Sequence, residues 1–342
     1  MSDPALDLQK TLGQYLSAFY PAWTHPVVLN LTNINAGWES DVYTFDLDHG
    51  PSSGRQRKAL VLRVYPGNDA YQKSAHEYRG MQLLRRAAYP VPEVYLLERD
   101  SSPLGAPFLV MERVAGQQLS LLFHGSESEK LRLLTQFCEL LMRLHTLDWR
   151  PFVQGLSDQS LVDPQKLINR EMGQWRTFFA QYPAPGFQPT LDWLAERQAE
   201  VRHPSPGPVH WDFHPSNILI RPDGSAVVID WTQIAISDTR FDLAWTLLLT
   251  EDEAWRERIL AEYERLLGRP VEDLSFFEVA AGVKRLYSTH LSISIGAEKL
   301  GMRPGAEKIM IENAPKLHAA YSMVFSHTHL RILELDALLG PP

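Results

Sequence analysis

The chain has 342 residues, of which 44% are hydrophobic and 22% are charged, and its formal net charge is −8. This composition is typical of a globular protein, and the length leaves room for two lobes. The negative charge and the lack of a basic stripe argue against a nucleic-acid partner, whereas acidity is compatible with a cationic small-molecule ligand. The sequence has no apolar run near the roughly 18 residues of a membrane span and no signal-peptide pattern at its start, so we expect a cytoplasmic protein without a membrane partner. A single cysteine, Cys138, excludes an internal disulfide and a thiolate metal cluster.

The first part of the chain predicts a small antiparallel β lobe that contains a helix. Apolar residues at helical spacing in 7–19 indicate a short amphipathic helix. Beyond it, β-branched and aromatic runs alternate with a polar turn and a second helical segment. The predicted strands are 42–47, 59–65, 94–97 and 108–114, and the predicted second helix is 74–87. We therefore expect one lobe over residues 1–115 and a second over residues 116–342.

The second lobe is predicted to be mainly helical. Residues 128–146 carry apolar side chains on one helical stripe. Two short strands, 218–221 and 225–230, are expected on either side of Asp223-Gly224, a dipeptide typical of a two-residue hairpin turn. The remainder of this lobe alternates helical stripes with Gly and Pro breaks.

The segment from His210 to Asn217, followed by Asp230, carries the most informative motif. If Pro222 lies opposite Ser225 in the hairpin, the antiparallel register places Asn217 opposite Asp230, with Cβ atoms roughly 4.5–5.5 Å apart. An amide oxygen and a carboxylate at that spacing can hold one magnesium ion, which prefers oxygen ligands and leaves positions for phosphates. Asp212, five residues before Asn217, can then face an incoming hydroxyl. A catalytic Asp, an Asn with four residues between them, and a metal-binding Asp is the order found in protein kinases.

These residues resemble a known family. His210-x-Asp212-x-x-x-x-Asn217, Ile229-Asp230-Trp231 and Asp242-Leu243-Ala244 are similar to motifs of the aminoglycoside phosphotransferase and choline kinase superfamily, the kinase-like small-molecule phosphotransferases. The resemblance implies an α+β, protein-kinase-like bilobal fold, with a small N-terminal antiparallel β lobe that binds nucleotide and a larger, mainly helical C-terminal lobe that binds the acceptor. Trp211 departs from the family, which usually has a small residue at that position, commonly Gly.

In the first lobe, the resemblance implies residues that bind the nucleotide. Arg63 stands where protein kinases carry a Lys that holds the phosphates, and Glu77 is its expected partner on the following helix. A guanidinium can hold phosphate oxygens in a bidentate manner. Gly37 and Ser40 lie in the expected phosphate-binding turn, which is poor in glycine.

The resemblance also implies contacts made by main-chain groups. We expect the adenine to be bound by backbone groups around Met111, Glu112 and Val114 at the lobe junction. In the second lobe, His210 is expected to steady the catalytic loop, and Asp242 to accept backbone donors beneath it. Both are therefore assigned structural support rather than chemistry.

The expected activity is transfer of the γ-phosphoryl group of ATP or GTP to a hydroxyl of a small molecule. Asn217 and Asp230 hold magnesium, Arg63 draws off developing charge, and Asp212 orients the acceptor hydroxyl and accepts its proton late. The interval from Trp231 to Thr239 is too short for the activation segment with which a protein kinase docks a polypeptide, which favours a small hydroxylated acceptor.

Two alternatives stay open at this point. His210, Asp212 and His214, spaced by two, would share one face of an extended strand and could bind zinc or iron in a metallohydrolase. Alternatively, the chain is a nucleotide-binding scaffold without turnover, since Arg replaces Lys and the loop has few glycines. A requirement for zinc or iron would distinguish the metallohydrolase from the kinase. Failure to release phosphate to any acceptor would distinguish the nucleotide-binding scaffold from the kinase.

Overall fold

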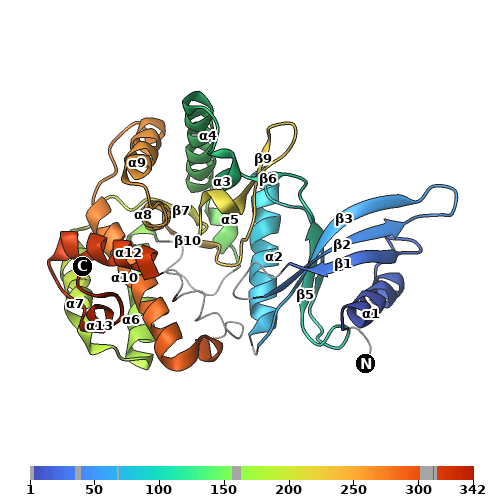
Figure 1. Ribbon diagram of the computed structural model, residues 1–342, viewed down its shortest axis with the longest axis horizontal. Coiled ribbons are helices and arrows are strands. Elements are labelled where there is room, and N and C mark those ends of the chain that lie inside the picture. Colours follow the sequence, from blue (N-terminus) through green and yellow to red (C-terminus); the bar gives the residue numbers. More distant parts are fainter. Residues whose placement is uncertain (1–3, 35–39, 68, 156–162, 301–310, 312–313) are drawn as a thin grey trace. The chain divides into compact units, whose positions relative to one another are not determined.

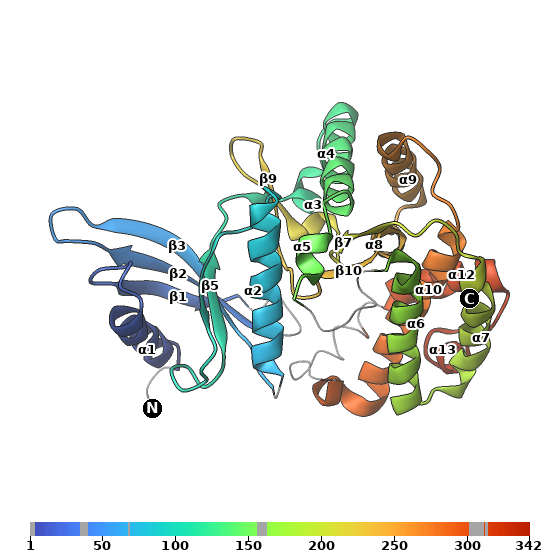
Figure 2. The ribbon, with the colours of Figure 1, turned by 180° about the vertical axis from the view of Figure 1, so that it is seen from behind.

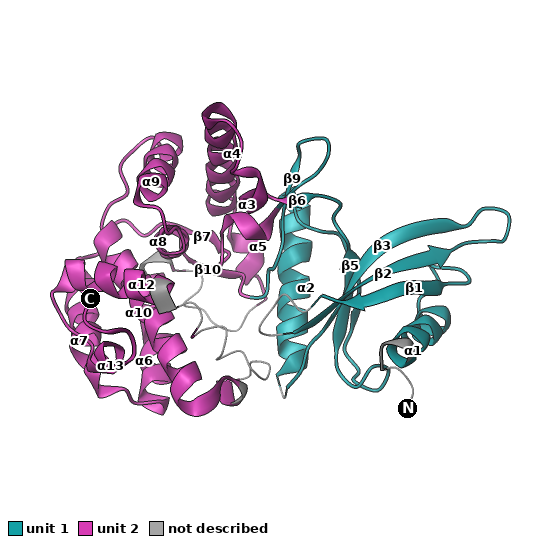
Figure 3. Cartoon of the chain, in the orientation of Figure 1, with its two compact units in different colours: residues 1–117, 219–232, 301–303 teal, residues 118–218, 233–300, 304–342 magenta. Residues whose placement is uncertain are grey.

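We describe a computed structural model of the chain, covering residues 4–34, 40–67, 69–155, 163–300, 311 and 314–342. By its internal contacts the chain divides into two units, which we describe separately (Figure 3). Unit 1 contains residues 1–117 and 219–232, and unit 2 contains residues 118–218 and 233–300 with the C-terminal segment. The hairpin that follows the catalytic motif therefore belongs with the N-terminal part of the chain, although the sequence places it in the middle of the second lobe.

Unit 1 is built on a five-stranded antiparallel sheet in the order β1-β2-β3-β5-β4 (Figure 1). The strands are β1 (Val27–Asn33), β2 (Asp41–His49), β3 (Gln56–Val64), β4 (Val94–Glu98) and β5 (Phe108–Glu112). The helices are α1 (Pro4–Phe19) and α2 (Ala70–Arg86). The expected strands, helices and antiparallel arrangement of this lobe are confirmed. The strands could be predicted because alternating apolar and polar residues specify half-buried strands.

The two faces of strand β3 bury different kinds of residue. Leu60 and Leu62 belong to a hydrophobic core that also includes Leu12 and Leu16 of helix α1. Because successive side chains of a strand point to opposite faces, Arg63 lies on the other face, where its guanidinium meets a carboxylate of α2. Figures 1 and 2 show the long helix α2 beside β5, and α2 also contacts β4. The alternation in β3 thus separates the core of the sheet from its charged site.

The hairpin after the catalytic motif has a different turn from the one expected. Its strands are β8 (Ile218–Ile220) and β9 (Ala226–Val228), and with β6 (Gln117–Gln118) they form a small sheet in the order β6-β8-β9. Arg221 N–H donates to Ser225 O, and Gly224 N–H donates to Arg221 O, at 2.8 and 2.9 Å. The loop therefore has three residues, closed by Gly224 at φ +82°, rather than two.

This turn corrects the expected register by one residue. Arg221, not Pro222, lies opposite Ser225, because Pro222 begins a turn whose last residue adopts the left-handed conformation that glycine allows. The carboxylate of Asp223 stabilises the turn by accepting hydrogen bonds from the N–H and the hydroxyl of Ser225. The pairing of Asn217 with Asp230 that we expected from a two-residue turn therefore does not follow from this hairpin.

Unit 2 is mainly helical, as expected. Its helices are α3 (Leu119–Leu122), α4 (Glu127–His145), α5 (Arg150–Val153), α6 (Pro164–Gln181), α7 (Gln188–Arg197), α8 (Thr239–Leu248), α9 (Glu253–Leu267), α10 (Leu274–Leu291), α12 (Ala314–Thr328) and α13 (Leu333–Leu339). Short 3-10 and π segments are η2 (Pro185–Phe187), η3 (Gln198–Glu200), η4 (Pro215–Asn217), η5 (Ser292–Gly296) and η6 (Ala297–Leu300), and strands β7 (Pro206–Val209) and β10 (Ala235–Asp238) pair antiparallel. The predicted helix at 128–146 is α4, which begins at a capping box formed by Ser126 and Glu129.

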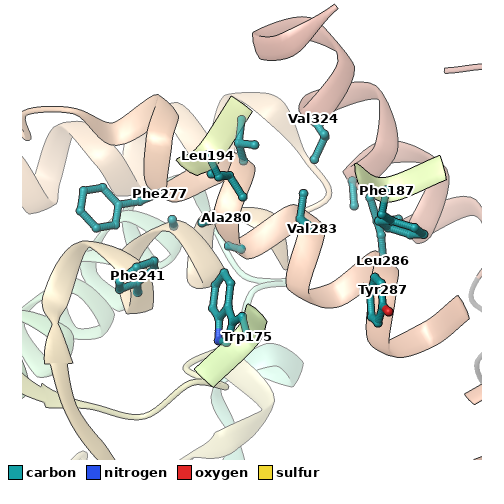
Figure 4. Packing of buried hydrophobic residues seen from close by; sticks show 14 of the residues in the cluster. Trp175, Phe187, Leu194, Phe241, Phe277, Ala280, Val283, Leu286, Tyr287 and Val324 are labelled. Atoms are coloured by element: carbon teal, nitrogen blue, oxygen red, sulfur yellow. The ribbon is translucent and has the colours of Figure 1, made fainter. Parts of the chain in front are cut away.

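The core of unit 2 is rich in aromatic rings around helix α10. Phe241 packs edge to face on Phe277, with ring centroids 4.8 Å apart, and Trp175 packs on Phe241 at 5.7 Å (Figure 4). Trp211 of the catalytic motif belongs to the same cluster and is 4% exposed. The loop that contains Trp211 is therefore anchored in the main hydrophobic core of this unit.

Among the described helices, none combines the length and the apolar character that crossing a membrane would require.

Candidate active site

Arg63 is the centre of a charged cluster in unit 1. Its Nε donates to Ser40 Oγ at 2.7 Å, its Nη1 to Glu77 Oε1 at 2.9 Å, and its Nη2 to Asp230 Oδ1 at 2.9 Å. The expected pairing of Arg63 with Glu77 is therefore present. Three of the five N–H donors of the guanidinium point at fixed oxygens, so the side chain has a single orientation.

Burial makes this cluster electrostatically strong. Glu77 is 1% exposed and Arg63 is 8% exposed. Burial by itself lowers the pKa of Arg63, but the carboxylates of Glu77 and Asp230 outweigh it and raise that pKa well above its ordinary value. Tyr65 donates its hydroxyl to Glu77 Oε2, and burial together with this carboxylate raises the pKa of Tyr65 well above its ordinary value. Both partners of Glu77 thus keep their protons.

Two expected nucleotide-loop residues have different outcomes. Ser40 is 1% exposed, and its hydroxyl accepts a hydrogen bond from Arg63, so it orients the guanidinium. Gly37 lies outside the described residues.

Hydrogen bonds within the sheet use some of the main-chain N–H groups near Met111 that could otherwise bind an adenine. Glu112 N–H donates to Glu93 O at 2.8 Å, and Arg113 N–H donates to Ala59 O at 3.0 Å. Met111 is 7% exposed and pairs with Val61 of β3. These two donors are therefore not available for the adenine contact that we expect around Met111, Glu112 and Val114.

Asp230 follows the hairpin in a left-handed backbone conformation, at φ +66°. Such a conformation is uncommon for residues other than Gly, Asn and Asp, and it redirects the side chain away from the strand alternation. Its Oδ1 accepts hydrogen bonds from Arg63 and, at 3.4 Å, from Thr232. In the part of the chain that is described, these contacts engage Oδ1, and Oδ2 keeps its capacity to accept a further partner.

The other part of the motif lies in unit 2, where Asp212 and Asn217 are joined. Asn217 Nδ2 donates to the backbone oxygen of Asp212 at 2.9 Å and to its Oδ2 at 3.2 Å. Both protons of the amide are thereby used, which leaves Asn217 Oδ1 as a hard oxygen suited to magnesium. The donor chemistry of Asn217 and Asp230, one amide and one carboxylate oxygen, fits this ion.

The carboxylate of Asp212 remains both ionised and accessible. Burial raises the pKa of Asp212, but His214, whose Nε2 is 3.4 Å from Asp212 Oδ2, outweighs this effect, with a further contribution from His210, and the pKa falls below its ordinary value. The Asp212 side chain is 41% exposed. It can therefore accept a hydrogen bond from an incoming hydroxyl without first losing a proton.

Asp242 holds the backbone of the loop that begins at His210 by accepting two of its N–H groups. Its Oδ2 accepts the N–H of His210 at 2.8 Å, and its Oδ1 accepts the N–H of Trp211 at 2.7 Å. Asp242 and His210 are both fully buried. These contacts are of the kind expected for a residue that supports the loop.

The metallohydrolase alternative finds no support in this geometry. It requires His210, Asp212 and His214 on one face of an extended strand, but Trp211 adopts φ +64°, which breaks the alternation. His214 instead caps the short helix η4 by accepting the N–H of Ser216 on its Nδ1. Over the residues with described positions, no three side chains among His, Cys, Asp and Glu form a group that could hold a metal ion.

Three residues of the site were not identified from the sequence. Tyr65 contacts Glu77, and its position two residues after Arg63 indicates the same face of the strand. His145, the last residue of α4, contacts Asp242 Oδ2 through Nε2 at 3.1 Å and Tyr263 through Nδ1 at 2.8 Å. Lys284 lies over the ring of Trp211, a contact with no signal in the sequence.

Known proteins share this sequence pattern and fold. A family model described as "Phosphotransferase enzyme family" matches residues 30–274, more than half of the chain. The mouse acyl-CoA dehydrogenase family member 10 is 31% identical over 222 residues, which cover 59% of this chain and 20% of that protein. The Escherichia coli hygromycin-B 4-O-kinase is 24% identical over 292 residues, or 77% of this chain and 75% of the kinase. This chain thus spans about a fifth of the mouse relative and three quarters of the bacterial one.

Solved structures agree with this relationship. A thermostable mutant of aminoglycoside phosphotransferase APH(4)-Ia, in a ternary complex with AMP-PNP and hygromycin B, superposes with a TM-score of 0.56 at 19% identity and covers 92% of this chain and 98% of its own. The structure of LicA in complex with AMP gives a TM-score of 0.58 at 14% identity, covering 94% and 99%. The fold of the chain is therefore that of the kinase-like phosphotransferases, and the chain belongs to the phosphotransferase enzyme family.

Proposed function

We propose that the protein transfers the γ-phosphoryl group of ATP to a hydroxyl of a small molecule, with magnesium. The observation that carries this proposal is the state of Asp212, whose carboxylate is ionised and accessible while its loop is held by Asp242 and Asn217. Phosphoryl transfer needs little covalent chemistry from the protein, so a fixed carboxylate that orients the acceptor is the feature it requires.

Each residue of the motif takes one role in the mechanism. Asp212 accepts a hydrogen bond from the acceptor hydroxyl and takes its proton late, as the acceptor oxygen bonds to the γ-phosphorus and the bond between that phosphorus and the departing ADP oxygen breaks. Arg63, oriented by Ser40 and Glu77, stabilises charge on the phosphate oxygens with its remaining N–H donors. Magnesium, held by Asn217 Oδ1 and Asp230, would neutralise charge on those oxygens.

The nucleotide and acceptor are assigned by chemical class. Structures of similar fold contain AMP-PNP, ADP or AMP, which supports an adenine nucleotide for this chain, bound by the carbonyl of Glu112 and the N–H of Val114. The hygromycin-B 4-O-kinase acts, by its name, on an oxygen of hygromycin B. A small hydroxylated acceptor, with cationic groups that suit the net charge of −8, is the corresponding class here.

The experiment compares three carboxylate variants of the purified protein with ATP, magnesium and a panel of hydroxylated metabolites and antibiotics that includes hygromycin B. Asp212→Ala should lower turnover by roughly 10²–10⁴-fold while nucleotide affinity by calorimetry stays within about twofold. Asp230→Ala should remove both turnover and magnesium-dependent ATP affinity.

Asp223→Ala is the matched control, because Asp223 lies at the exposed turn of the hairpin that precedes Asp230, where its carboxylate accepts hydrogen bonds from Ser225. It should retain activity. Equal residual turnover in Asp212→Ala and Asp230→Ala, or magnesium-independent hydrolysis by either, would contradict the assigned roles.

A further inference from the structure

Trp211 combines a strained backbone with a buried side chain next to Asp212. Its φ of +64° lies in the left-handed region, which is costly for a bulky L-residue and free of cost for glycine. Its ring is 4% exposed and packs on Phe241, with centroids 5.7 Å apart. Because local strain persists only where surrounding contacts impose it, something must hold the indole in this position.

Lys284 of helix α10 provides such a contact. Its Nζ lies 3.5 Å from the centroid of the Trp211 ring. Two further indoles surround it, with Trp245 of α8 at 5.5 Å and Trp175 of α6 at 5.7 Å. The ammonium therefore sits in a cage of three tryptophans, a chemistry that proteins use to bind cations.

The carboxylates that face Lys284 are otherwise engaged. Glu171 of α6 accepts the N–H of Trp175 and the hydroxyl of Ser237, and Asp242 of α8 accepts the loop N–H groups. Within the described part of the chain, neither forms an ion pair with Lys284. Burial lowers the pKa of Lys284 to about 8, although Glu171 and Asp242 act in the opposite direction. The principal direct partner of the ammonium is thus the face of Trp211.

We propose that Lys284 is a positioning residue, whose protonated ammonium holds the Trp211 indole and thereby fixes the backbone that aims Asp212. The effect of this contact on catalysis rests on the proposed role of Asp212. Its effect on the conformation of the loop does not depend on that role. The cation–π contact thus offsets the strain of a left-handed backbone at Trp211.

The test measures hydrogen–deuterium exchange of the peptide that contains residues 210–213. In Lys284→Met, a near-isosteric change, exchange should rise by about tenfold, because a desolvated cation–π contact is lost. Lys284→Arg should restore protection, since a guanidinium also binds an indole face. Lys166→Met, the same change at an exposed lysine of α6, serves as the control and should have no effect.

A double-mutant cycle isolates the contact with Trp211. In a Trp211→Gly background the backbone strain is gone, so Lys284→Met should no longer change exchange of the loop. In the unsubstituted protein, protection corrected for intrinsic exchange should fall as the pH rises through about 8, and Lys284→Arg should remove this fall. Thermal unfolding midpoints of all variants verify that each is folded.

The outcomes distinguish this proposal from the proposed function. Unchanged loop exchange in Lys284→Met, or an equal increase in the Trp211→Gly background, would overturn the positioning role. If turnover with magnesium-ATP and hygromycin B is measurable, Lys284→Met should lower kcat about tenfold with little change in the KM for the acceptor; a rise in KM alone would instead make Lys284 an acceptor ligand. Absence of turnover in the unsubstituted protein would count against the proposed function and leave the exchange result decisive for Lys284.

Discussion

Arg63 Nη2 and Asp230 Oδ1 lie 2.9 Å apart, so strand β3 is joined to the residue that follows the β8–β9 hairpin, 167 positions later in the chain. The same guanidinium holds Glu77 of helix α2. A single arginine therefore connects the sheet, the helix and the hairpin of unit 1. This connection gives the cluster a role in stability in addition to its proposed role in phosphate binding.

Replacing Arg63 with Met should destabilise the protein by about 3–5 kcal/mol, because it leaves the buried carboxylate of Glu77 without its cation. Asp230 contributes less to this loss, since its side chain is 35% exposed. Arg63→Lys should cause a smaller loss of unfolding free energy than Arg63→Met, because an ammonium keeps the charge but cannot reach three fixed acceptors. Urea unfolding measures the change.

The control for this prediction is Arg55→Met. Arg55 pairs with Asp48 at 3.0 Å, but the two side chains are 31% and 24% exposed, so the loss should be below about 1 kcal/mol. Similar losses of unfolding free energy in Arg63→Met and Arg55→Met would show that burial does not increase the contribution of the Arg63 cluster to stability.

Glu278 should give unit 2 a stability that depends on pH. It is 6% exposed and contacts Arg256 through Oε1 and His327 Nε2 through Oε2, the latter at 2.9 Å. Burial raises the pKa of Glu278, but His327 and Arg256 outweigh it, so the pKa in the folded protein is lowered. Its contribution is therefore present above the unfolded pKa of roughly 4.3 and is lost as the pH falls through the lower, folded value.

Glu278→Gln should accordingly lower the free energy of unfolding by roughly 1–3 kcal/mol at pH 7, and the difference should shrink as the pH falls below about 4. Glu196→Gln, at an exposed carboxylate, should change stability by less than about 0.5 kcal/mol at pH 7. Chemical denaturation at a series of pH values measures both. A penalty for Glu278→Gln that grows toward acid pH has the wrong sign for this account.

Gly207 of strand β7 should not tolerate a side chain. A Cβ there would lie 2.5 Å from the carbonyl oxygen of His145 and 2.7 Å from Thr239 Cγ2. Because the first of these is a backbone atom, the strand or the end of α4 must shift, and we expect Gly207→Ala to cost about 1–3 kcal/mol in thermal unfolding.

Gly173→Ala is the matched substitution, because nothing lies within 4 Å of a Cβ at this position in helix α6. It should stabilise the protein by about 0.5–1 kcal/mol through helix propensity. If both glycine variants shift the unfolding midpoint in the same direction, the close approach at Gly207 is not the cause.

Local residue patterns determined the secondary structure and the candidate residues of the site. Alternation in β3 and helical spacing in α2 placed Arg63 and Glu77 on elements that can meet, and the structure shows their ion pair. The hairpin turn was placed correctly, but its register was wrong by one residue. Asp223-Gly224 is compatible with both two-residue and three-residue loops, and the left-handed conformation of Gly224 at the end of a type I turn selects the longer one.

The sequence by itself determined the helices and strands, because spacing and periodicity act over short distances along the chain. Its resemblance to the kinase-like phosphotransferases implied the fold, and the motif spacing identified Asp212, Asn217 and Asp230 as candidates. Only the tertiary structure decided that the hairpin with Asp230 packs in unit 1, that His145 supports Asp242, and that Lys284 covers Trp211. These contacts join residues far apart in sequence, and they depend on which helix faces meet when the aromatic core forms. A local sequence pattern does not predict which helix faces pack together, because packing is specified by the shape and burial of many residues at once.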